Sequence, residues 1–138
     1  MPIPASLRRL VFERDRYRCV YCLTTQENSG QPLQIDHIVP MSKGGSSTLD
    51  NLCSCCDSCN KHKYARQKAP DPLTGELTAL FHPRQQEWQE HFAWDEGRTV
   101  IVGLTSVGRA TVAALRINNE TVVRARRRWV EAGWHPPT

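Results

Sequence analysis

The stretch Cys56-Asp57-Ser58-Cys59 decides the fold when it is paired with the earlier stretch Cys19-Val20-Tyr21-Cys22. Each stretch is a Cys-x-x-Cys pair that can chelate a metal ion, and four thiolates satisfy tetrahedral zinc. Such a site is closed and structural, because no ligand position remains for a substrate. Zinc would join the two ends of segment 23–55 and contribute to its folding. The sequence therefore predicts a structural zinc site with four ligands: Cys19, Cys22, Cys56 and Cys59.

Two further cysteines, Cys53 and Cys55, leave an alternative, because Cys53-x-x-Cys56 is also a formal pair. We favour Cys56 with Cys59, since the polar residues that follow suit a knuckle leading into a helix. Cys53 and Cys55 are then expected on a strand, where a free cysteine behaves as a small apolar residue. Disulfides are disfavoured because nothing in the sequence indicates export, and clustered cysteines in a reducing compartment favour metal.

Length and composition restrict the class of protein. The chain has 138 residues, 39% of them hydrophobic, which suits one domain or one domain with an appendage. No apolar run reaches the length of a bilayer span, and residues 1–6 lack the apolar stretch of a signal peptide. We therefore expect a cytoplasmic protein that does not bind membranes.

Charge is unevenly distributed along the chain. Residues 1–69 carry a net charge of +4, residues 70–97 carry −5, and residues 98–138 carry +5. A basic surface attracts polyanions such as nucleic acid. Solvation of the surface explains the same charges, so charge alone does not decide between the two interpretations.

Local patterns predict the order of the elements. A break rich in Pro and Gly at 69–75 separates a domain at 1–69 from a C-terminal extension at 70–138. In the domain we expect a helix over 6–16 capped by Ser6, strands over 33–39 and 49–55, and a helix over 60–66. In the extension we expect helices over 84–92, 106–117 and 120–132, the last two capped by Thr105 and Asn119, and a strand over 98–104.

Four polar residues between and after the knuckles can carry chemistry: Asp36, His37, Asn51 and Asn60. Adjacent side chains on a regular strand point in opposite directions, so the strand would have to bend near Pro40 to bring Asp36 and His37 together. The Asp36 carboxylate and the Asn60 carbonyl are oxygen ligands that suit Mg²⁺. His37 can take a proton from water at neutral pH.

This arrangement resembles the HNH nucleases, and the likeness covers residues 6–63. It is carried, in family order and spacing, by five motifs: Cys19–Cys22, Leu33–Pro40, Ser42–Gly45, Asp50–Leu52 and Cys56–Lys63. The resemblance implies an α+β fold with a ββα-metal (His-Me finger) core stapled by a four-cysteine zinc site. Residues 76–138 are more weakly similar to the tails of small stand-alone bacterial HNH proteins, which implies an α/β extension packed on the core.

The resemblance also implies an activity, the hydrolysis of phosphodiester bonds in DNA with one divalent metal ion, Mg²⁺ or Mn²⁺. His37 would be the general base, and Asp36 and Asn60 would bind the catalytic metal. Asn51 would hold the loop and orient the histidine. The third motif residue is often histidine in the family, so it stays open whether Asn60 or His62 meets the metal. Water would attack phosphorus in line and leave 5′-phosphate and 3′-hydroxyl ends.

Basic residues near these motifs are candidates for DNA contacts. Lys61, Lys63 and Arg66 would face the phosphate backbone, and the cluster Arg124, Arg126, Arg127 and Arg128 would either bind DNA or keep a helix soluble. The alternative function, from another class, is a catalytically silent zinc-ribbon module that binds nucleic acid or protein. The intact set of Asp36, His37, Asn51 and Asn60 favours the nuclease, because a silent module has no need of an acid–histidine pair.

Overall fold

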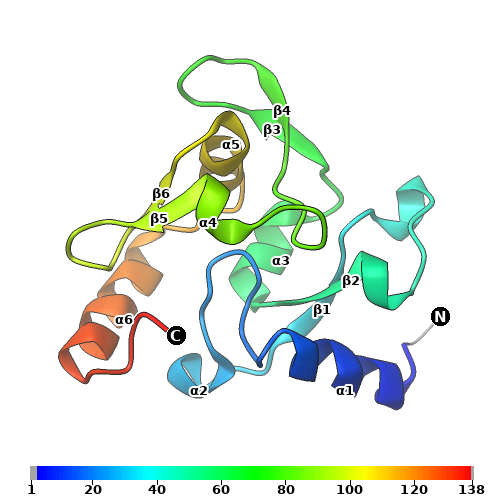
Figure 1. Ribbon diagram of the computed structural model, residues 1–138, viewed down its shortest axis with the longest axis horizontal. Coiled ribbons are helices and arrows are strands. Elements are labelled where there is room, and N and C mark those ends of the chain that lie inside the picture. The colour runs from blue at the N-terminus through cyan, green and yellow to red at the C-terminus, as the bar shows by residue number, and fades with distance from the viewer. Residues whose placement is uncertain (1–2, 138) are drawn as a thin grey trace.

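The computed structural model describes residues 3–137, which form helices and three small antiparallel sheets of two strands each (Figure 1). The helices of the described chain are α1 (Ala5–Arg14), α2 (Gln26–Ser29), α3 (Asp57–Lys63), α4 (Trp88–His91), α5 (Ser106–Ala114) and α6 (Glu120–Glu131), with two 3₁₀ turns, η1 (Met41–Lys43) and η2 (Leu49–Asn51). The strands pair as β1 (Gln34–His37) with β2 (Leu52–Cys55), β3 (Lys68–Pro70) with β4 (Leu77–Ala79), and β5 (Phe92–Trp94) with β6 (Ile101–Gly103). The mixed helices and strands confirm the predicted α+β class.

The hairpin of β1 and β2 followed by α3 forms the unit that positions the site. Asp36 pairs with Cys53 and His37 pairs with Leu52 in an antiparallel register. Helix α3 begins two residues after β2 ends and packs against β1. This order of two strands and a helix is the ββα core that the sequence predicts.

Helix α1 supports β2 from outside the hairpin. It begins at Ala5, after Pro4, without a side-chain cap, so the prediction that Ser6 caps the helix is wrong. At its C-terminal end, the Arg14 guanidinium donates to the carbonyl oxygens of Leu49 and Leu52, at 2.6 Å each. The Asp15 carboxylate accepts a hydrogen bond from the Ser54 backbone N–H at 2.8 Å. Because these bonds cross from helix to strand, α1 fixes the position of β2.

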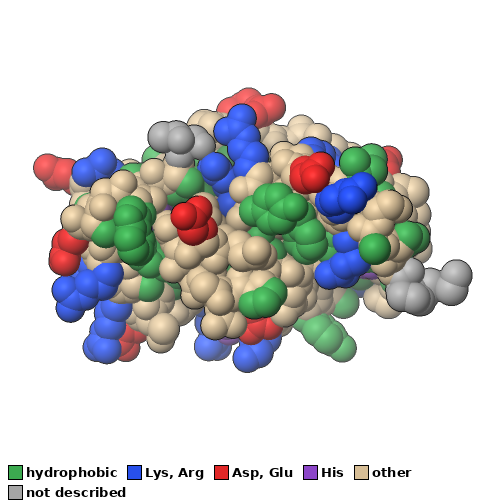
Figure 2. All heavy atoms as spheres, turned by 90° about the horizontal axis from the view of Figure 1, so that it is seen from below, with side chains coloured by type: hydrophobic (Ala, Val, Ile, Leu, Met, Phe, Trp, Pro, Cys, Tyr) green, Lys and Arg blue, Asp and Glu red, His purple; other side chains and the backbone are tan. Residues whose placement is uncertain are grey.

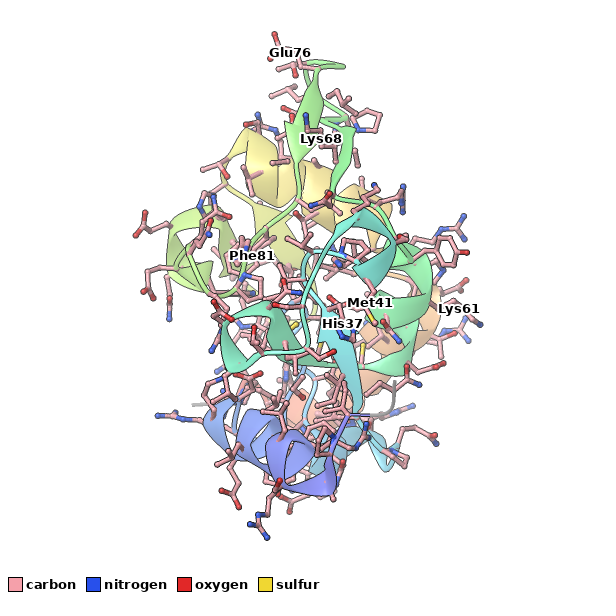
Figure 3. All side chains as sticks on the ribbon, turned by 90° about the vertical axis from the view of Figure 1, so that its right-hand side faces the viewer. His37, Met41, Lys61, Lys68, Glu76 and Phe81 are labelled. Atoms are coloured by element: carbon pink, nitrogen blue, oxygen red, sulfur yellow. The ribbon has the colours of Figure 1, made fainter. Side chains whose placement is uncertain are left out.

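The segment 69–75, where the sequence predicts a break between domain and extension, lies within a β-hairpin. Strands β3 and β4 pair across the turn that holds Pro72 and Gly75, and the predicted boundary between residues 69 and 70 falls within β3. Figure 3 shows this hairpin, labelled at Lys68 and Glu76, extending from the rest of the molecule. Its Asp71 carboxylate is buried and accepts hydrogen bonds from Arg109 of α5, which lower the pKa of Asp71 to about 2. An ion pair therefore anchors the turn to the extension.

The extension packs through aromatic side chains. Phe92 is buried, and its ring lies 5.2 Å from that of Phe81 and 5.3 Å from that of Trp88. The predicted helix over 84–92 contracts to α4, because residues 83–85 form a turn and the chain becomes helical only at Trp88. The predicted caps are confirmed: the Thr105 and Asn119 side chains accept hydrogen bonds from the first turns of α5 and α6.

Within residues 3–137, no helix combines the length and the apolar character needed to cross a bilayer.

Candidate active site and zinc centre

Four cysteine sulfur atoms meet between the first knuckle and the start of α3. The Sγ atoms of Cys19, Cys22, Cys56 and Cys59 all lie within 4.8 Å of one another. Those of Cys22 and Cys56 are 3.6 Å apart, close to the roughly 3.8 Å that separates two sulfurs around zinc at Zn–S distances of about 2.3 Å. The other two cysteines, Cys53 and Cys55, lie on β2, so the preferred ligand set is the one that the fold assembles.

The electrostatics of this cluster disfavour four free thiolates. Hydrogen bonds from the thiols of Cys19, Cys56 and Cys59 hold the pKa of Cys22 well below its ordinary value. Burial raises the pKa of Cys19, and the crowded sulfurs raise the pKa values of Cys56 and Cys59. A bound cation would stabilise the thiolates, and four sulfur ligands fit a tetrahedral zinc ion.

Local backbone structure brings these sulfurs together. In the first knuckle the Leu23 backbone N–H returns to the Cys19 carbonyl at 2.9 Å, with Leu23 at a φ of 62°. In the second knuckle Cys56 is the N-cap of α3, and its Sγ accepts a hydrogen bond from the Cys59 backbone N–H at 3.4 Å. The predicted knuckle leading into a helix is therefore present, although α3 begins at Asp57 rather than at residue 60.

The Asp36 carboxylate points from β1 into the interior, where it is 5% exposed. Its Oδ2 atom accepts a hydrogen bond from the Tyr21 hydroxyl at 3.0 Å and lies 3.0 Å from Lys63 Nζ. Lys63 also donates to the backbone carbonyls of His37 and Ile38, at 3.3 Å and 3.2 Å. No hydrogen bond from residues 3–137 reaches the other carboxylate oxygen, Oδ1. One oxygen is thus held by the protein, and the other remains free to serve as a ligand.

The expectation that Lys63 faces DNA is therefore wrong. Its side chain is 2% exposed and belongs to the interior between α3 and β1. The two other basic residues of this group are exposed: Lys61 projects from the outer side of α3 (Figure 3), and the Arg66 guanidinium donates to the carbonyls of His62 and Ala114. Both remain candidates for contacts with a phosphate backbone.

The His37 imidazole lies on the opposite face of β1 from Asp36. His37 is still paired within the hairpin, so the strand does not bend as expected, and the side chains of residues 36 and 37 diverge. His37 Nε2 lies 2.9 Å from the hydroxyl of Ser47, in the loop between β1 and β2. When Nε2–H donates to that hydroxyl, the lone pair of the ring is on Nδ1.

Asn51 clamps the loop that carries Ser47. Its Oδ1 accepts from the Val39 backbone N–H at 2.8 Å, and its Nδ2 donates to the carbonyls of Val39 and Ser46, at 3.0 Å and 2.8 Å. Gly45 lies beneath this clamp, where a Cβ atom would fall 1.7 Å from the Val39 carbonyl oxygen. Only glycine fits at this position, so packing as well as the turn explains the Gly44-Gly45 pair.

Asn60 lies against β1, whereas His62 lies on another side of α3. Asn60 Nδ2 donates to the Gln34 side chain at 2.6 Å, and Gln34 shares its face of β1 with Asp36. His62 Nδ1 lies 2.8 Å from the Ser58 carbonyl, and its side chain lines a cavity of about 590 Å³ beside Cys59. Asn60 and Asp36 therefore share the interface of β1 and α3, and His62 does not. Among residues 3–137 no hydrogen bond or ion pair joins Asp36, His37 and Asn60 directly.

Sequence reasoning missed three members of this neighbourhood, Tyr21, Gln34 and Ser47, and gave Lys63 the wrong role. Tyr21 stands inside the first cysteine knuckle and Lys63 follows the second, so closeness to those motifs is a signal for both. Gln34 follows from strand alternation, because it lies two residues before Asp36. Ser47 has no comparable signal, since the loop between residues 41 and 48 offers three hydroxyl groups.

The arginine cluster of α6 is divided by the fold. Arg126 is fully buried, so the expectation that it contacts DNA is wrong. Arg124 and Arg128 are exposed and form ion pairs along the helix with Glu120 and Glu131. On the face shown in Figure 2, basic side chains are interspersed with acidic ones and do not merge into one continuous surface. This pattern is typical of a solvated helix.

Comparison with known proteins agrees with this geometry. Residues 19–66 match the family described as HNH endonuclease. The chain is 33% identical over 45 residues to the type IV methyl-directed restriction enzyme EcoKMcrA of Escherichia coli (strain K12). That match covers 32% of this chain and only 16% of the restriction enzyme. No solved structure matches the chain significantly.

Proposed function

We propose that this protein is a nuclease that hydrolyses phosphodiester bonds in DNA with one divalent metal ion, Mg²⁺ or Mn²⁺, since residues 19–66 match the HNH endonuclease family. The observation that carries the proposal is the division of β1 into two faces. Asp36 faces α3 and Asn60, and His37 faces the loop that Asn51 clamps. Methyl-directed recognition belongs to the restriction enzyme as a whole and is not part of the proposal.

The catalytic metal would be held by Asp36 and Asn60 rather than by His62. Gln34 occupies the Asn60 amide nitrogen, which leaves the Asn60 carbonyl oxygen for coordination. The unpartnered Oδ1 of Asp36 belongs to the same interface. Two oxygen donors with otherwise open coordination suit Mg²⁺ or Mn²⁺, which would act there as a Lewis acid on the phosphate. The four-cysteine cluster would hold a separate, structural zinc ion.

His37 would be the general base. With Ser47 holding Nε2, its Nδ1 atom takes a proton from water as the water oxygen bonds to phosphorus. The bond from phosphorus to the 3′-oxygen breaks, the leaving oxygen takes a proton from solvent, and 5′-phosphate and 3′-hydroxyl ends result. Asn51 acts as a positioning residue because it fixes the backbone on both sides of Ser47.

Lys61 and Arg66 are our candidates for contacts with the DNA backbone, since both are exposed near the end of α3. Binding through them would weaken steeply with salt.

A silent zinc module is the second candidate, and one observation favours it. Lys63 already places a cation beside Asp36, so a metal ion at Asp36 would have a like charge as its neighbour. The two candidates differ in whether DNA is cleaved at all.

A plasmid-nicking assay with Mg²⁺ or Mn²⁺ tests the proposal. The wild type should nick supercoiled DNA only with metal, and His37→Ala should lower the rate by about 10²–10⁴-fold. His62→Ala is the matched control, because this histidine lies outside the proposed site, and it should retain activity. If neither wild type nor variants cleave single-stranded, double-stranded or branched DNA, the silent module is the correct interpretation.

A further inference from the structure

A cavity of about 410 Å³ lies between the ββα unit and the extension. Its lining comes from the chain after β1, from the end of α3 and the start of β3, and from the segment that follows β4. Ile38 and Val39 form the first of these walls, and they directly follow His37. In the view of Figure 3, Phe81, which lines the cavity, lies between Lys68 above and His37 below. The cavity is large enough for a small ligand or for part of a larger one.

Three cationic side chains line this cavity, which we call the basic groove: Lys63, Arg66 and Lys68. The charge of Lys63 is compensated, because its Nζ atom lies 3.0 Å from the Asp36 carboxylate. Within residues 3–137, neither Arg66 nor Lys68 forms an ion pair with a carboxylate. Both side chains are exposed, so two uncompensated cations face the solvent at the groove.

The absence of carboxylates distinguishes the basic groove from other cavities of the described chain. None of its lining residues is acidic, whereas three other cavities each include a carboxylate: Asp57, Glu87 and Glu27. Cations gathered in a concave site reinforce one another and raise the local concentration of anions. The composition of the groove therefore favours an anionic ligand.

The guanidinium of Arg66 is held in place at the edge of the groove. Its Nη2 group donates to the carbonyls of His62 and Ala114, at 2.6 Å and 2.9 Å, which joins the end of α3 to the end of α5. Within residues 3–137 its Nε and Nη1 groups make no hydrogen bond. A planar guanidinium that is already positioned, with donors to spare, suits the oxygens of a phosphate.

The extension adds two neutral donors to the groove, His82 and Gln86. The Nδ1 atom of His82 accepts from the Arg84 backbone N–H at 3.2 Å, so the proton of the neutral ring is on Nε2. The Oε1 atom of Gln86 accepts from the His82 backbone N–H at 2.8 Å, which leaves the amide nitrogen of Gln86 as a donor. Neutral donors of this kind commonly accompany cations around the phosphates of DNA.

One residue joins the groove to the candidate site. Lys63 lines the groove, donates to the carbonyls of His37 and Ile38, and pairs with Asp36. Every nucleotide of a DNA strand carries a phosphate, so a strand with one linkage at His37 brings further phosphates close to the residues that follow β1. We propose that the basic groove binds a phosphate of the cleaved DNA strand beside the scissile linkage, through Arg66 and Lys68. The inference rests on the proposed function, since it takes DNA as the ligand.

The proposal makes the C-terminal extension part of the substrate site. Lys68 belongs to the β3–β4 hairpin, and His82 and Gln86 follow that hairpin, so one wall of the groove lies outside the ββα unit. A phosphate contact fixes the position of DNA without reading its sequence. The groove would therefore align the strand over His37 and leave the choice of sequence to other residues.

The salt dependence of DNA binding tests the proposal. Fluorescence anisotropy of a labelled DNA duplex gives the dissociation constant at several salt concentrations, without added Mg²⁺ or Mn²⁺ so that the DNA stays intact. Lys68→Gln should weaken binding to all sequences alike and lower the slope of log K against log salt by about 1, as expected for one lost phosphate contact. The double variant with Arg66→Gln should lower the slope by about 2.

Arg127→Gln is the matched control. It removes one exposed positive charge from α6, and no residue of α6 lines the groove. Its slope should equal that of the wild type. Equal slopes for Lys68→Gln and Arg127→Gln, with a wild type that binds DNA, would overturn the groove alone. A wild type that binds no DNA would overturn the proposed function as well.

Nuclear magnetic resonance of the full ¹⁵N-labelled chain provides a readout that needs no variant. Addition of a short DNA duplex should shift the backbone amide signals of Lys68, Ala79 and Gln86, and should leave those of α6 in place. Inorganic phosphate is the second titrant, because a site for free phosphate would share the same chemistry. Shifts at these amides with inorganic phosphate but not with DNA would overturn the proposal, and so would DNA-induced shifts confined to α6.

Discussion

The ββα unit and the C-terminal extension are stabilised by different interactions. In the interior of the ββα unit lie charged and polar groups, among them the Asp36–Lys63 pair and the Asn51 clamp, beside a cluster of thiols. In the extension the interior consists mainly of rings and aliphatic chains, with Phe92 and Ile101 each 1% exposed, although Asp71 and Arg126 are also buried there. The half that carries the candidate chemistry therefore has the less apolar core.

This difference shows how a small domain can keep polar groups inside. Apolar burial stabilises roughly in proportion to area, so a unit with charged groups in its interior needs a further contribution. A zinc ion at the four cysteines would supply that contribution in the ββα unit, whereas the extension contributes packing. Three predictions test the contrast, in order of decreasing effect.

Cys56→Ser should have the largest effect, because structural zinc contributes on the order of 10 kcal/mol to the folding of small zinc domains. We expect zinc content to fall from one ion per chain to none and hydrogen exchange to accelerate across residues 19–66. Cys53→Ser should retain its zinc, since Cys53 lies on β2 outside the cluster. One zinc ion remaining in Cys56→Ser would instead make Cys53 or Cys55 a ligand.

Lys63→Met should destabilise the protein by about 3–5 kcal/mol, because it leaves the Asp36 carboxylate buried without its cation. The free energy of unfolding in urea measures the effect, and the double variant with Asp36→Asn should recover part of it. If Asp36 is a metal ligand, Mn²⁺ should raise the melting temperature of Lys63→Met more than that of wild type. An equal rise in the two proteins would argue against Asp36 as a ligand.

Ile101→Val should have the smallest effect, a loss of about 0.5–1.5 kcal/mol, which is typical of one methyl group removed from a packed core. The same urea titration measures it. Zinc content and nicking rate should not change, because Ile101 lies in the extension. A change in either would show that packing in the extension controls the site, and would break the contrast between the two regions.

Sequence reasoning predicted the ββα unit well because its signals are local. Each knuckle, the short strand at Asp36 and the polar residues that follow Cys59 form a short continuous pattern that can be recognised by itself. The β3–β4 hairpin was missed because Pro72 and Gly75 are as typical of a linker as they are of a turn between two strands. The ion pair between Asp71 and Arg109 is what holds this segment as a turn, and Arg109 lies on α5, far away in the sequence.

The candidate site was harder to predict where a charged residue turns inward. Lys63 and Arg126 each stand beside other basic residues, and sequence position alone favours exposure for both. Asp36, which pairs with Lys63, and the Thr99 carbonyl, which accepts from Arg126, lie far away in the sequence and become neighbours only when the chain folds. Burial of a long cationic side chain depends on such a partner, so periodicity cannot reveal it.

The opposed directions of residues 36 and 37 make strand alignment part of the chemistry. Sliding β1 by one position would turn the His37 imidazole toward α3 and the Asp36 carboxylate toward the Ser47 loop, so the two side chains would exchange faces. Asn51 and Lys63 oppose this slide, since the Asn51 carbonyl accepts from the Ile38 N–H at 2.9 Å and Lys63 Nζ lies 3.0 Å from the Asp36 carboxylate. Two residues outside β1 thus contribute to which side chain the DNA would meet.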